Sequence, residues 1–98
     1  MNKEEIKNLV TEMVQNDPDG SKIRSIALFG SFLHGDTTPE SDIDLIIEMA
    51  KPIGLFTFVG IKQNLEAKLG RPVDLVTPNG LSHYIRDKVL SEAEVIYG

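Results

Sequence analysis

Hydrophobic residues near the start of the chain recur every three or four positions. They are Ile6, Leu9, Val10, Met13 and Val14. This spacing is the period of a helix with one buried face, so it predicts a helix over residues 3–15. Asn2 is a suitable N-cap for that helix, and the turn-forming residues 17–20 follow it.

Three short apolar runs are typical of β-strands. They cover residues 23–29, 43–48 and 73–76, and turn-forming residues lie close to each of them. The run at 43–48 is apolar on both faces, which predicts a sheet that is covered on both sides. We also expect a short terminal strand at residues 95–97.

Further helices complete the pattern. Residues 55–69 and 81–90 have apolar positions at helical spacing, and Gly70 ends the first of these segments. Residues 31–34 are expected to form one helical turn that Gly35 closes. The alternation of helices and strands predicts a compact α/β fold, in a single domain that spans residues 1–98.

The composition narrows the classes of function. Of the 98 residues, 41% are hydrophobic and 26% are charged, and no apolar run reaches the roughly 18 residues of a membrane span. The net charge of -5 weighs against stable nucleic-acid binding, which depends on clustered Lys and Arg. The absence of cysteine excludes disulfides and thiolate metal sites. We expect a cytoplasmic protein that does not enter a membrane.

Two aspartates stand at the start of the second predicted strand. Asp42 and Asp44 are two residues apart, so both side chains are expected on one face of the sheet, with Ile43 on the other. Two carboxylates aimed at one place repel each other, and a divalent cation relieves that repulsion. Oxygen ligands suit Mg²⁺, which commonly bridges carboxylates to phosphates. The alternative is that Asp42 is a turn residue and Asp44 a solvated strand-edge residue.

A third aspartate, Asp74, lies within the apolar strand 73–76. A charge buried there would need a partner, either a Lys or Arg side chain or a metal ion shared with Asp42 and Asp44. Three carboxylates with one or two Mg²⁺ ions are the arrangement used for phosphoryl and nucleotidyl transfer. The third carboxylate is also placed to accept a proton from the acceptor group.

Gly30 and Ser31 follow the first predicted strand. A strand that turns at a glycine into a helix start presents backbone N–H groups and a hydroxyl, which together can bind phosphate oxygens. If the first two strands run antiparallel, this turn lies beside the acidic pair. A nucleoside triphosphate would then bind with its outer phosphates at Gly30 and Ser31 and its reacting phosphate near the metal.

The segment GSFLHGDTTPESDIDLIIE resembles the signature of the polymerase-β-type nucleotidyltransferase superfamily in its minimal branch, and GRPVDLVTP resembles the third-acid segment of that branch. The resemblance implies the polymerase-β-like fold, a small mixed β-sheet flanked by helices. It extends to the MntA-like antitoxins, which are partners of HEPN-domain ribonuclease toxins. By this resemblance Gly30 and Ser31 bind the triphosphate, Asp42 and Asp44 hold Mg²⁺, and Asp74 completes the triad.

The same resemblance implies a Mg²⁺-dependent enzyme that moves AMP from ATP onto a tyrosine of a HEPN-type toxin and silences it. We expect a hetero-complex or a homo-oligomer. One residue departs from the family pattern, because many relatives carry Arg where this chain has His34. A neutral imidazole lends less charge to phosphate binding, although it can donate a hydrogen bond.

Two alternatives remain open at this point. In the first, the same chemistry acts on a small molecule or an RNA end, although the acidic chain shows no basic surface that would hold such an acceptor. In the second, the domain is a binding antitoxin that neutralises its partner by occlusion, without catalysis. A need for ATP in neutralisation separates the enzyme from the binding module.

Overall fold

The computed structural model describes residues 1–35, 37–38 and 40–98. The helices are α1 (Lys3–Asn16), α2 (Ser31–His34), α3 (Leu55–Leu69) and α4 (His83–Glu92), and two short 3₁₀ turns are η1 (Gly20–Lys22) and η2 (Pro78–Gly80). The strands are β1 (Ile23–Phe29), β2 (Ile43–Met49), β3 (Val73–Val76) and β4 (Glu94–Tyr97). The predicted helices and strands are therefore all present, with ends that shift by two residues or fewer.

The four strands form one mixed sheet in the order β3-β2-β1-β4. β1 runs antiparallel to both β2 and β4, whereas β2 and β3 are parallel. The small mixed sheet flanked by helices that the sequence predicted is confirmed. Because β1 and β2 are antiparallel, the end of β1 lies beside the start of β2, and Phe29 pairs with Asp44.

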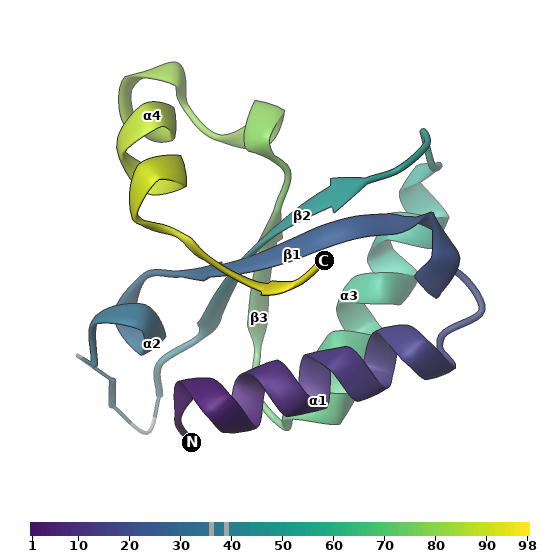
Figure 1. Cartoon of the computed structure of the whole chain (residues 1–98), viewed down its shortest axis with the longest axis horizontal. Coiled ribbons are helices and arrows are strands. Elements are labelled where there is room, and N and C mark those ends of the chain that lie inside the picture. Colours follow the sequence, from purple (N-terminus) through teal and green to yellow (C-terminus); the bar gives the residue numbers. More distant parts are fainter. Residues whose placement is uncertain (36, 39) are drawn as a thin grey trace.

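The hydrophobic core lies between one face of the sheet and two helices. Figure 1 shows α1 and α3 side by side along that face. The core residues with the least exposure are Ile6, Val10, Ile26, Leu28, Ile43, Leu45, Ile47, Ile61 and Leu65. Asn2 caps α1 as expected, since its side chain accepts a 2.9 Å hydrogen bond from the N–H of Glu5. This face of the sheet is thus fully covered.

The second face of the sheet is only partly covered, so the expectation of cover on both sides is wrong. Along β2, the residues that point away from the core are Asp44, which is half-buried, Ile46, which is buried, and Glu48, which is exposed. The turn η2 packs near β2, but no residue of α4 is buried. A second helix layer is not needed there, because Ile46 is the one apolar residue of β2 on that face.

Large apolar side chains remain exposed on two helices. At the start of α3, Leu55 is 72% exposed and Phe56 is 93% exposed, so Phe56 is a surface residue. On α4, Tyr84 and Ile85 are exposed as well. Within the part of the chain that the structure describes, none of the helices has the length and apolar character needed to cross a membrane.

We expect Ile61→Ala to lower the free energy of unfolding by about 2–5 kcal/mol, because Ile61 is a core residue whose removal leaves a cavity. Phe56→Ala in the same helix is the matched control, with an expected change within about 0.5 kcal/mol. Urea denaturation followed by circular dichroism measures both. If both variants lost the same free energy of unfolding, the assignment of Ile61 to the core and Phe56 to the surface would be contradicted.

Candidate active site

The turn after β1 brings the backbone against an aspartate. Gly30 has φ 75° and ψ -152°, a conformation that is essentially restricted to glycine. A Cβ atom at this position would lie 2.9 Å from Cγ of Asp44, which is closer than carbon atoms pack. Glycine is therefore required here on two counts, backbone conformation and space.

The helical turn α2 continues directly from this glycine. The N–H groups of Leu33 and His34 donate to the carbonyl of Gly30 at 3.1 and 3.2 Å, and Gly35 in the left-handed conformation ends the turn. The earliest N–H groups of a helical turn have no partner inside it. The half-buried Ser31 is the first residue of α2 and follows Gly30, whose backbone lies against Asp44. Unpaired N–H groups and a hydroxyl at the start of a helical turn are donors that can bind an anion.

Asp44 is close enough to the two other aspartates of the predicted triad to be affected by their charges. It pairs in register with Asp74 of β3, and Ile43 is buried in the core, so Asp44 faces the opposite way. Burial raises the pKa of the Asp44 carboxyl, and the negative charges of Asp74 and then Asp42 raise that pKa further. The three carboxylates that the sequence selected therefore form one anionic cluster at the edge where β2 and β3 begin.

Asp74 is exposed, not buried as its apolar strand suggested. β3 is an edge strand of four residues, and its alternate residues Val73 and Leu75 supply the buried face. Asp74 points to the open face beside Asp44 and needs no buried partner. Its proximity to Asp44 remains, but the reason for that proximity is strand register and not compensation of a buried charge.

The carboxylates suit Mg²⁺ as part of a larger ligand set. Among the described residues, no three acidic, histidine or cysteine side chains are close enough to hold a metal ion by themselves. Mg²⁺ commonly binds through one or two carboxylates together with substrate phosphates and water. The oxygen donors of Asp42 and Asp44, and the raised pKa of Asp44, fit such a cation when a triphosphate supplies the remaining ligands.

His34 and Arg71 lie in segments that adjoin the site residues in the chain: His34 in α2 after Gly30, and Arg71 in the turn before β3. His34 Nε2 lies 3.7 Å from a carboxylate oxygen of Glu92 at the end of α4. Arg71, which the sequence patterns did not single out, lies over the Phe32 ring of α2. A lone arginine in a turn has no spacing that indicates a role, so only the folded structure reveals this neighbour of the site.

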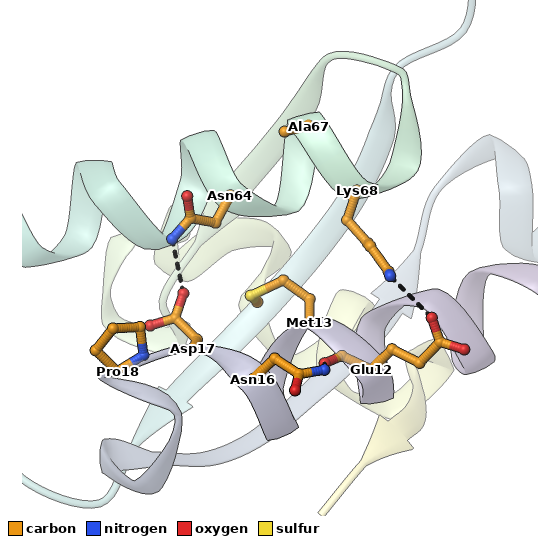
Figure 2. Close-up of a pocket in the computed structure, with 8 residues that line it drawn as sticks. All are labelled: Glu12, Met13, Asn16, Asp17, Pro18, Asn64, Ala67 and Lys68. Carbon is orange, nitrogen blue, oxygen red and sulfur yellow. Dashed lines mark hydrogen bonds and ion pairs between the residues drawn. The ribbon is translucent and has the colours of Figure 1, made fainter.

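A separate hollow of about 370 Å³ lies between α1 and α3, on the core side of the sheet (Figure 2). Its polar side chains pair with one another: Lys68 Nζ lies 2.8 Å from Glu12 Oε2, and Asn64 Nδ2 donates to Asp17 Oδ2 at 2.7 Å. These contacts connect the two helices across the hollow. They do not converge on a common point, which is the feature expected of a ligand site.

Comparison with known proteins identifies the family of this chain. The model of the nucleotidyltransferase domain family matches residues 6–96. The chain belongs to this nucleotidyltransferase family. Its resemblance to the minimal branch of the polymerase-β-type superfamily is thereby confirmed, and by family it is an enzyme of the nucleotidyltransferase class.

Relatives of this nucleotidyltransferase cover nearly its whole length. The protein adenylyltransferase MntA of Thermococcus cleftensis is 33% identical over 94 residues, which span 96% of this chain and 93% of the relative. A crystal structure of a toxin-antitoxin with AMP-PNP has a TM-score of 0.75 at 27% identity, and the match covers 94% of this chain and 73% of that one. A protein assigned as a minimal nucleotidyltransferase has a TM-score of 0.77 at 28% identity, with 95% and 94% covered.

We expect Gly30→Ala to lower the free energy of unfolding by about 1–3 kcal/mol, because alanine cannot adopt this conformation without strain. Gly60→Ala is the matched control: it lies inside α3 with open space around an added Cβ, and it should stabilise by about 0.5–1 kcal/mol. Urea denaturation measures both variants. A Gly30→Ala variant as stable as the wild type would contradict the need for glycine at this position.

We expect Asp44→Asn to raise the free energy of unfolding at pH 7 when no divalent cation is present. The folded-state pKa of Asp44 is raised, so the folded state favours the protonated carboxyl, and the wild type loses stability as pH rises through that pKa. The advantage of Asn should therefore shrink as pH falls toward the ordinary aspartate value of 3.8. Urea denaturation across this pH range, with the exposed Asp87→Asn as control, measures the difference. A variant less stable than wild type at pH 7 would contradict it.

Proposed function

We propose that this nucleotidyltransferase is a Mg²⁺-dependent protein adenylyltransferase that acts as an antitoxin, moving AMP from ATP onto a tyrosine of a HEPN-type ribonuclease toxin. The observation that carries the proposal is the close approach of the Gly30 backbone to Asp44, where a side chain at position 30 would displace the Asp44 carboxylate. This approach supports the proposal because N–H groups that could bind phosphate would then lie close to a carboxylate that could bind the cation of a metal-bound triphosphate.

In this proposal each half of the site holds one part of the nucleotide. Gly30 and Ser31 bind the outer phosphates through N–H groups and the hydroxyl. Asp42, Asp44 and Asp74 would hold Mg²⁺ only together with phosphate oxygens, and the bound cation would neutralise phosphate charge. The partly open face of the sheet leaves room for a second molecule, because Asp74 is exposed there.

The transfer needs no oxidant and no further reactant. The acceptor oxygen bonds to the α-phosphorus of ATP, the bond from that phosphorus to the bridging oxygen breaks, and pyrophosphate leaves. The acceptor's proton passes to a carboxylate oxygen of Asp74, which acts as the general base. The products are pyrophosphate and a tyrosine joined to AMP through a phosphodiester bond.

A protein acceptor is favoured by the surface and by the relatives. Leu55 and Phe56 on α3, and Tyr84 and Ile85 on α4, are large apolar side chains left exposed, which is typical of surfaces that bind other proteins. The relative from Thermococcus cleftensis is a protein adenylyltransferase, and the AMP-PNP structure is that of a toxin-antitoxin. We therefore propose a hetero-complex with the toxin.

A second candidate is a binding antitoxin that acts by occlusion, and His34 is the residue that favours it. Where the family pattern has Arg, this chain has an imidazole near Glu92, whose carboxylate offsets any positive charge on the ring. Less positive charge would then reach the phosphates. An RNA-end acceptor is disfavoured by the net charge of -5.

The experiment is label transfer from ATP labelled at its α-phosphate, with Mg²⁺, in lysate of the source organism. We expect a labelled protein band with the wild type and its loss with Asp42→Asn/Asp44→Asn, because transfer needs the cation that these carboxylates hold. The double variant Asp19→Asn/Asp87→Asn, at a half-buried and an exposed aspartate outside the three-aspartate cluster, is the matched control and should retain labelling.

The alternative outcomes are distinct. Label in RNA would replace the protein acceptor with a nucleic acid. No label from folded wild-type protein, together with neutralisation that does not depend on ATP, would favour occlusion. Retained labelling in the Asp42→Asn/Asp44→Asn variant would contradict the proposed roles of both carboxylates.

A further inference from the structure

Arg71 sits in a rigid connection between α3 and β3. Gly70 ends α3 in the left-handed conformation and donates its N–H to the carbonyl of Glu66 at 2.8 Å. On the other side of Arg71, the carboxylate of Glu66 accepts the N–H of Val73 at 3.0 Å, and the carbonyl of Pro72 accepts the first N–H of β2 at 3.0 Å. The backbone on both sides of Arg71 is therefore fixed.

The side chain of Arg71 reaches from this connection to two other segments of the site. Its guanidinium carbon lies 5.2 Å from the centre of the Phe32 ring, within the range of a cation-π contact. One of its terminal nitrogens donates a long hydrogen bond of 3.5 Å to the carbonyl of Ser41. Phe32 follows Ser31 in the chain, and Ser41 precedes Asp42.

The Ser41 end of this bridge is itself ordered by local hydrogen bonds. The N–H of Thr38 donates to the Ser41 hydroxyl at 2.8 Å, and the N–H of Ser41 donates to the Thr38 carbonyl at 3.0 Å. Phe32, at the other end, is 6% exposed and belongs to the core. Arg71 thus connects two anchored segments. One contains the Gly30–Ser31 turn, and the other leads into Asp42 and Asp44.

We propose that Arg71 is a positioning residue for nucleotidyl transfer, which fixes the Gly30–Ser31 turn relative to Asp42 by bridging Phe32 and Ser41. This inference rests on the proposed function, since it concerns the alignment of the triphosphate between those two groups. A guanidinium can stack on a ring and donate a hydrogen bond in its own plane at the same time. Lysine, as a point charge, cannot reproduce both contacts.

The first test measures the steady-state kinetics of AMP transfer from ATP by the Arg71→Met and Arg71→Lys variants. We expect kcat to fall by about 10- to 100-fold in both, because a small misplacement of aligned groups is costly, while KM for ATP changes by less than about threefold. Arg24→Lys and Arg24→Met, at an exposed position of β1, are matched controls that should leave both parameters unchanged. Wild-type kcat in Arg71→Lys would overturn the proposal, because charge alone would then suffice.

The second test is hydrogen exchange without nucleotide, which does not depend on catalysis. We expect Arg71→Met to speed exchange of the amides at residues 31–35 and 41–44, while the amides of α1 and the middle of α3 keep their wild-type rates. Unchanged rates at residues 31–35 and 41–44 would overturn the proposal, whatever the activity. If the wild type transfers no label, the proposed function fails, yet this exchange comparison still decides whether Arg71 orders the site.

Discussion

The site depends on the close approach of the Gly30 backbone to the Asp44 carboxylate. Glycine is favoured at this position because its φ is positive and because an added Cβ would displace the Asp44 carboxylate. The approach sets a turn suited to phosphate against a carboxyl whose pKa is raised by burial and by two neighbouring aspartates. Such a cluster is electrostatically unfavourable alone and becomes favourable when a cation and phosphates occupy it together.

Strand pairing places the other site residues around the contact between Gly30 and Asp44. The antiparallel β1–β2 pair places Phe29 opposite Asp44, and the parallel β2–β3 pair places Asp74 on the other side of Asp44. The helices α1 and α3 cover the opposite face of the sheet (Figure 1), and a change of strand register would expose the apolar residues buried there. The face that carries the aspartates stays partly open, which leaves an acceptor room to approach.

Much of this arrangement follows from sequence, for identifiable reasons. The helical period around Ile6 and Val10 is a local pattern, and the helix it predicts agrees with the structure. The two-residue spacing of Asp42 and Asp44 is also local, and the charge of Asp42 is near enough to raise the pKa of Asp44. The exposure of Asp74 was predicted wrongly, because an apolar strand at a sheet edge has the same composition as a buried one. The bridge from Arg71 to Phe32 depends on residues 39 positions apart in the chain, and no local pattern encodes it.

The central claim is that a metal-bound nucleotide occupies the edge of the sheet at Gly30 and Asp44. The most direct measurement is paramagnetic broadening of backbone amide signals by Mn²⁺ with AMP-PNP, since Mn²⁺ binds the same oxygen ligands as Mg²⁺. Our account predicts selective broadening at Gly30, Ser31, Asp44 and Asp74, and sharp signals around the hollow between α1 and α3. Broadening centred on that hollow, or no selective broadening, would contradict it.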